Sequence, residues 1–185
     1  MKSIIITISL LTLTILSSLT AKKNNTNPAN PLLANHFKYP VGPPDGKGYY
    51  NAQPFGKNNH LGDDWNGNSG GNSDLGDTIY AVANGYINTA KDLGGSWGNI
   101  IRMTHYLKDE SQVESIYAHC HEILVDSGNF VGIGTPIGTI GTANGKYPAH
   151  LHFEMRSDLN LPIGGGYSLN KEGYLDPTAF IKAHR

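Results

Sequence analysis

The chain of 185 residues is 38% hydrophobic and 16% charged, a balance that suits one globular domain with its own hydrophobic core. Its formal net charge of -1 excludes the basic surface that nucleic-acid binding requires, so we expect no nucleic acid as a partner. A single cysteine, Cys120, excludes a disulfide bond within the chain, and the fold must therefore rest on its core.

The first 21 residues are typical of a secretory signal peptide. Lys2 is followed by an apolar run from Ile4 to Leu16, and small residues precede Ala21, after which we expect cleavage. The apolar run is shorter than the roughly 20 residues of a membrane-spanning helix, so we expect no membrane span after cleavage. The sequence thus predicts an exported protein, either periplasmic or secreted.

Residues 22–44 are polar and rich in Asn and Pro, which indicates a linker or a lead-in segment that drapes over the domain. We place the folded domain at residues 45–185. Alternating strand patterns dominate this region, and the Asn84-Gly85 dipeptide predicts a hairpin between the first two strands. We expect strands within residues 78–83, 86–90, 99–105, 115–121, 132–141 and 148–154, and one helix at 177–184. The fold class is therefore predominantly antiparallel β.

The first candidate cluster combines His60 with Asp64, four residues later. Both residue types are ordinary zinc ligands, and the intervening Gly62 allows the backbone to turn so that the two side chains converge. The alternative is a surface turn that the aspartates cap. The polar loop at residues 66–76 follows directly, and a gating role for it and a tolerated surface insertion remain open.

The strand expected at residues 116–122 carries a first pair of histidines. Because side chains alternate along a strand, His119 and His121 are expected on one face and Cys120 on the other. Cys120 is either a nucleophile beside histidines or a small buried hydrophobic residue, and we favour the buried residue.

The strand expected at residues 148–154 carries a second pair. His150 and His152 share one face, whereas Leu151 and Phe153 point into the core. Two imidazoles at this spacing can serve one metal ion. On spacing alone, this pair and the pair at 119 and 121 compete for the metal.

The order of these motifs resembles the lysostaphin/LytM-type zinc metallo-endopeptidases, which cut bacterial peptidoglycan. The resemblance covers residues 55–181 and rests on HLGDD, YAH and HLHFE in the correct order, with DTIYAVANGYI, GNIIRMTH, VGIGTPIGTIGTANG and LDPTAF as further landmarks. It implies a mainly β domain, a single antiparallel β-sheet or sandwich with a zinc groove.

The resemblance also implies a role for each of five residues. His60, Asp64 and His152 would hold one Zn²⁺ ion, and His119 and His150 would be catalytic without binding the metal.

The chain departs from the family pattern at several places, and none of them removes a ligand. Cys120 stands where Leu is usual, Pro148-Ala149 replaces the usual Gly-Pro, and the loop at 66–76 is longer than the common form. The loop and Tyr147 bear on substrate preference. We interpret His105 as structural.

The function that the resemblance implies is hydrolysis of peptide stems or cross-bridges in peptidoglycan by metal-activated water, outside the cytoplasm. One alternative is a catalytically inactive activator of cell-wall amidases with the same fold, a class that normally lacks metal ligands. Another is a secreted zinc peptidase with a substrate other than the wall. All five site residues are present, which favours an enzyme.

Overall fold

The computed structural model describes residues 32–185, so the expected signal peptide lies outside the described residues. The strands are β1 (Tyr49–Gln53), β2 (Asp63–Gly67), β3 (Thr78–Tyr80), β4 (Gly85–Asp92), β5 (Asn99–Tyr106), β6 (Gln112–Cys120), β7 (Phe130–Val131), β8 (Pro136–Thr139), β9 (Leu151–Arg156) and β10 (Tyr174–Leu175). Two helical segments accompany them, η1 (Lys57–Asn59) and α1 (Pro177–Ala183). No helix in residues 32–185 is long and apolar enough to cross a membrane.

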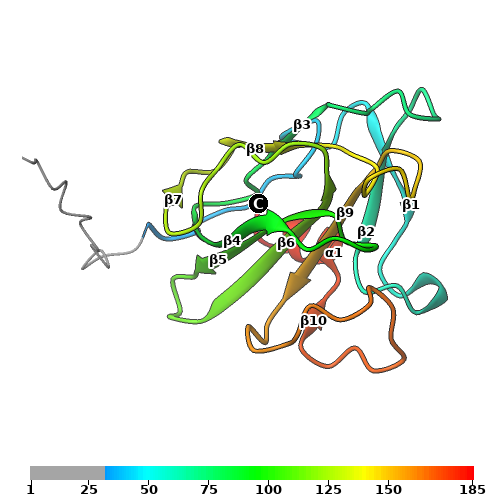
Figure 1. Ribbon diagram of the computed structural model, residues 1–185. Helices are drawn as coiled ribbons and strands as arrows, with labels where there is room; N and C mark the ends of the chain where they lie inside the picture. The colour runs from blue at the N-terminus through cyan, green and yellow to red at the C-terminus, as the bar shows by residue number, and fades with distance from the viewer. Residues whose placement is uncertain (1–31) are drawn as a thin grey trace, which may run out of the picture.

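One large antiparallel sheet forms the body of the domain (Figure 1). Its strand order is β1-β2-β9-β6-β5-β4-β7, with β10 paired to β9 off this path, and β3 and β8 form a separate two-stranded sheet. The predicted antiparallel β domain is confirmed. β9 lies in the middle of the sheet, between β2 on one side and β6 on the other.

The alternation of β9 separates a core face from a polar face. Leu151, Phe153 and Met155 are fully buried in the hydrophobic core, where Phe153 packs against Tyr117 of β6 with ring centroids 5.1 Å apart. Each such buried apolar side chain contributes roughly 1.5–3 kcal/mol to stability. The other face of β9 carries polar side chains, among them His152, Glu154 and Arg156.

The hairpin expected at Asn84-Gly85 is wrong, because β3 pairs with β8 while β4 pairs with β5 and β7. Asn84 instead ties three segments together. Its side chain donates to the Leu33 carbonyl and accepts from the Ile133 amide, at 3.0 and 2.9 Å. A Cβ at position 85 would lie 2.7 Å from Nδ1 of His105, so glycine is needed for this close approach. The dipeptide therefore connects two sheets.

The described part of the lead-in segment packs against the domain. Phe37 and Val41 are buried in the core, and the Phe37 ring meets Phe180 of α1 edge-on at 5.0 Å. The Phe37 amide donates to the His184 carbonyl at 2.8 Å. Core packing thus begins before residue 45, where we expected the domain to start.

Helix α1 lies within the predicted helix at 177–184, and one of its side chains forms a hydrogen bond with strand β2. Asp176 caps its first turn by accepting from the Ala179 amide at 2.9 Å. The hydroxyl of Thr178 donates to Oδ2 of buried Asp63 at 2.6 Å. Asp63 immediately precedes Asp64, so α1 helps to fix β2 at the site.

Candidate metal centre

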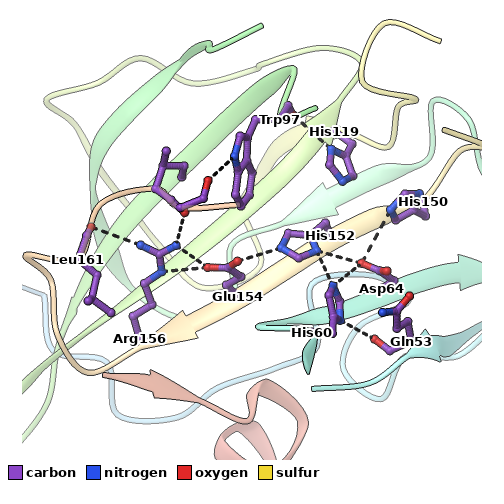
Figure 2. A network of polar contacts seen from close by, with 12 residues as sticks. Gln53, His60, Asp64, Trp97, His119, His150, His152, Glu154, Arg156 and Leu161 are labelled. Carbon is purple, nitrogen blue, oxygen red and sulfur yellow. Dashed lines mark hydrogen bonds and ion pairs between the residues drawn. The ribbon is translucent and has the colours of Figure 1, made fainter. Parts of the chain in front are cut away.

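Strands β2 and β9 bring together the three residues that we expected to bind a metal. Asp64 stands opposite His152 in the β2–β9 register, and His60 precedes β2. Nδ1 of His152 lies 3.0 Å from both Nε2 of His60 and Oδ1 of Asp64, which are 3.3 Å apart (Figure 2). In a tetrahedral zinc site with bonds of 2.0–2.2 Å, ligand atoms are separated by about 3.3–3.5 Å. The spacing of these three atoms is close to that value.

His60 and His152 each have one ring nitrogen that faces the cluster and one that faces away from it. The hydrogen bond of the nitrogen that faces away determines which of the two carries the proton. Nδ1 of His60 lies 3.0 Å from the Gln53 carbonyl, and Nε2 of His152 lies 3.0 Å from Oε1 of Glu154. Both partners only accept hydrogen bonds, so these nitrogens carry the protons. The inward nitrogens then present lone pairs toward Oδ1 of Asp64. Three electron-rich atoms at this distance repel one another unless a cation or a proton lies among them, and the donor set of two nitrogens and one oxygen fits zinc.

The electrostatics of the cluster also favour a positive charge. Burial alone would lower the pKa of His152, but hydrogen bonds to Asp64 and Glu154 outweigh it and raise that pKa to about 9. Burial alone would raise the pKa of Asp64, but hydrogen bonds from His152 and His60 hold it well below its ordinary value. Without a metal, a proton therefore occupies the position that suits a cation.

Gly62 allows the segment between His60 and Asp64 to approach β9 closely. A Cβ at position 62 would lie 2.5 Å from the Phe153 carbonyl oxygen and 3.1 Å from Cε1 of His152. No side chain fits in this space, so the two ligands depend on a glycine between them.

A buried ion pair supports His152 from behind. Oε2 of Glu154 accepts from Nε and Nη2 of Arg156 at 2.9 and 2.6 Å, and both side chains are fully buried. Arg156 also donates to the carbonyls of Leu161, Pro162 and Ile163, at 3.4, 2.9 and 2.9 Å. His152 is thus connected through the side chains of Glu154 and Arg156 to the loop at residues 157–173 (Figure 2).

Sequence reasoning missed Glu154 and Arg156 as members of the site. The period of two on β9 was the available signal, because it places both residues on the face that carries His150 and His152.

The two expected catalytic histidines lie beside the cluster, with ring centroids 4.8 Å apart. Nδ1 of His119 faces the Trp97 carbonyl at 3.3 Å, and Nδ1 of His150 faces the Pro148 carbonyl at 2.9 Å. Because a carbonyl only accepts, each Nδ1 carries the proton and each Nε2 has a lone pair. Nε2 of His150 lies 3.8 Å from Oδ1 of Asp64. Burial, together with His152 and His150 nearby, lowers the pKa of His119 to about 3.

The expectation that His119 and His121 share one strand face is wrong, because β6 contains a bulge. Asn99 pairs with Cys120 and Ile101 pairs with Tyr117, so β6 has one more residue than β5 between these pairs. His119 has a φ of 66° within this stretch. His119 consequently faces the site, whereas His121 is exposed and does not line the pocket.

Cys120 lies in the core on the other side of β6, as expected for a small buried residue. Its side chain is 4% exposed, and burial raises the pKa of the thiol to about 12. A neutral, buried thiol has no access to a substrate, so the nucleophile hypothesis is not supported.

Four of the five residues, Asp64, His119, His150 and His152, line one open pocket with a volume of about 590 Å³, whereas His60 is buried beside it. Aromatic side chains and a run of glycines form much of its wall; the lining residues outside the five are Gln53, Ser96, Trp97, Tyr147, Pro148, Gly164, Gly165, Gly166 and Tyr167. The Trp97 indole donates to the Gly164 carbonyl at 3.0 Å, which joins two parts of this wall.

Comparisons with known proteins agree with this architecture. The solved structure of the antimicrobial peptidase lysostaphin from Staphylococcus simulans matches with a TM-score of 0.57 and 22% identity, over 83% of this chain and 55% of that chain. The catalytic domain of a prophage-encoded M23 protein from Enterococcus faecalis matches with a TM-score of 0.55 and 19% identity, over 77% of this chain and 95% of that chain.

A zinc containing peptidase from Vibrio cholerae matches with a TM-score of 0.51 and 24% identity, over 66% of this chain and 37% of that chain. At these identities the likenesses show the fold, and this chain spans about half the length of lysostaphin. A search of curated proteins found no significant match. The sequence model of peptidase family M23 matches residues 59–165, which is more than half of the chain and includes all five candidate residues. The chain therefore belongs to peptidase family M23.

Proposed function

We propose that this protein is an exported zinc endopeptidase that hydrolyses peptide bonds of bacterial peptidoglycan. The observation that carries the proposal is the convergence of Nε2 of His60, Oδ1 of Asp64 and Nδ1 of His152 within 3.0–3.3 Å, at an open pocket that Asp64 and His152 line. Their outer hydrogen bonds leave the inward lone pairs free for a metal ion. Zinc bound there would acidify a water molecule and polarise the carbonyl of the scissile bond.

His150 and His119 would carry the proton transfers. Each has its Nδ1 proton held by a backbone carbonyl, so its Nε2 is free to accept a proton from the attacking water. The resulting imidazolium can then donate that proton to the departing amine.

The shape of the pocket suits a peptide chain with small side chains. Gly164, Gly165 and Gly166 place no side chains along one wall, and the rings of Tyr147 and Tyr167 offer flat apolar surfaces. Stem peptides and cross-bridges of peptidoglycan are short peptides that contain small residues, and they lie outside the cytoplasm, where the expected signal peptide would direct the protein.

The test is digestion of purified sacculi by the pure protein, with the released muropeptides identified by mass spectrometry and zinc measured in the same preparation. We expect new amino termini and one zinc ion per chain, and we expect Asp64→Ala to lack both. A wild-type protein that carries zinc but cleaves only peptides from outside the wall would be a peptidase with another substrate. A folded wild-type protein without zinc or cleavage would point to the inactive activator.

A further inference from the structure

Asn66, near the end of β2, and Asn72, in the loop that follows β2, hold the residue that precedes His150. Nδ2 of Asn66 donates to the Ala149 carbonyl at 3.2 Å, and Oδ1 of Asn72 accepts from the Ala149 amide at 2.8 Å. Ala149 is fully buried and lies just before β9, outside the strand pairing. Both of its main-chain polar groups, which would be costly to leave unpaired, are therefore satisfied by the side chains of Asn66 and Asn72.

The loop is itself fastened to the domain. Oδ2 of the buried Asp74 accepts from the Gly67 amide at 2.9 Å, which closes the loop on its own beginning. The Gly76 amide donates to the Ile140 carbonyl at 2.8 Å, which attaches the end of the loop to the segment after β8. These contacts make the loop a support, in contrast to the gating role that the sequence left open.

The two asparagines act on the peptide groups on either side of Ala149. A peptide group is planar, so the Ala149 amide and the Pro148 carbonyl turn together. Asn72 therefore orients the carbonyl that accepts the Nδ1 proton of His150 at 2.9 Å. In the next peptide group, Asn66 holds the Ala149 carbonyl while the His150 amide donates to the Gly141 carbonyl at 3.2 Å.

We propose that Asn66 and Asn72 are positioning residues that keep His150 in its Nδ1-protonated form with Nε2 directed at the metal centre. The expected effect on the rate of peptide hydrolysis rests on the proposed function. The expected effect on which nitrogen of His150 carries the proton does not. Neither asparagine contacts His60, Asp64 or His152 through the hydrogen bonds described, so zinc binding is unaffected.

The same substitution, Asn→Asp, at positions 66, 68 and 72 distinguishes the loss of a positioning hydrogen bond from the effect of an added negative charge. Asn66→Asp replaces a donor with an acceptor that faces the Ala149 carbonyl, whereas Asn72→Asp keeps the acceptor that Ala149 needs. Asn68→Asp is the charge-matched control, because Asn68 is exposed and its side chain makes no hydrogen bond with the described residues. We expect Asn66→Asp to lower kcat by about 10- to 100-fold with a smaller change in KM. Asn72→Ala should do the same, Asn72→Asp should retain most of the activity, and Asn68→Asp should match the wild type.

The protonation of the His150 ring is observed by nuclear magnetic resonance of zinc-loaded protein with ¹⁵N-labelled histidine. The signals of His150 are the ones that are missing from the spectrum of His150→Ala. We expect the Nδ1-protonated form in the wild type and in Asn72→Asp, and a mixture with the Nε2-protonated form in Asn66→Asp and Asn72→Ala. Zinc content and thermal unfolding show whether each variant is folded. If Asn66→Asp does not fold, the comparison of Asn72→Asp with Asn72→Ala tests the proposal.

An unchanged ring form and rate in folded Asn72→Ala would overturn the proposal, as would equal losses in Asn72→Asp and Asn72→Ala. A wild-type protein that cleaves no peptide would contradict the proposed function alone. The protonated nitrogen of His150 would still show whether the asparagines position its ring.

Discussion

Asp64 on β2 and His152 on β9 are a directly opposed cross-strand pair, with Oδ1 and Nδ1 3.0 Å apart. The register of two strands thus sets the distance between two of the expected metal ligands. A shift of one residue would turn His152 toward the core and bring Leu151 or Phe153 to the polar face. Burial of those two apolar side chains therefore stabilises the register on which the metal centre depends.

Removal of a ligand and removal of a proton-transfer group should have different effects. His152→Ala should lose both zinc and activity, because one of three protein ligands is gone. His119→Ala should keep one zinc per chain while turnover falls by about 10²–10⁴-fold. Metal analysis and turnover of the purified proteins check this expectation. If His119→Ala or His121→Ala lost zinc while His152→Ala kept it, the ligand set would be wrong.

An alanine at position 62 should break the metal centre without touching a ligand. Its Cβ would lie 2.5 Å from the Phe153 carbonyl, so β2 and β9 must separate locally. We expect Gly62→Ala to lower the free energy of unfolding by about 1–3 kcal/mol and to weaken zinc binding. Gly165→Ala is the control, because nothing lies within 4 Å of its Cβ position, and it should keep stability and zinc. Wild-type zinc affinity in Gly62→Ala would show that the close approach is not needed.

Glu154 should matter for the metal more than a comparable buried carboxylate does. Glu154→Gln removes the charge that faces Nε2 of His152, and we expect a loss of zinc affinity of about 10- to 100-fold. Glu114→Gln is matched to it, because Glu114 is also buried and also receives two hydrogen bonds from an arginine, Arg102. That variant should lose stability and keep zinc affinity. Competition titrations with a chelator measure both, and equal zinc loss would contradict the role of Glu154.

The buried His105 should make stability depend on pH. Burial lowers its pKa to about 4, below the ordinary value of 6.5, although a hydrogen bond to the Asn84 carbonyl opposes the shift. The unfolded chain therefore takes up the proton first as the pH falls. The contribution of neutral His105 is complete above about pH 6.5 and is lost toward pH 4, by roughly 3 kcal/mol. The free energy of unfolding, measured with denaturant at several pH values between 4 and 7, should change less with pH in His105→Asn than in the wild type. The exposed control His121→Asn should show the same change with pH as the wild type.

The sequence predicted those parts of the structure that depend on local pattern. The alternation around His150 and His152 placed Leu151 in the core correctly, and the helix before His184 begins where proline and a capping aspartate indicate it. Convergence of His60 with β9 required the pairing of distant strands, which spacing alone does not contain. The family resemblance supplied that link.

The failures have physical causes. The bulge in β6 occurs at His119, where no glycine marks the positive φ, so the strand alternation was extended across a residue that breaks it. The Asn84-Gly85 dipeptide has the composition of a tight hairpin, but the side chain of Asn84 is occupied by contacts to other segments. In both cases tertiary contacts override a local preference.

The side chain of Arg156 binds the segment that precedes Gly164 in the pocket wall, and it contacts only main-chain atoms of that segment. Its contacts there are the carbonyl oxygens of Leu161, Pro162 and Ile163, atoms that every amino acid possesses. Mutations can therefore change the side chains of this segment without removing the groups that fasten it. The side chains at residues 161–163 can therefore vary in sequence while Arg156 keeps its main-chain contacts and its ion pair with Glu154, the residue beside His152.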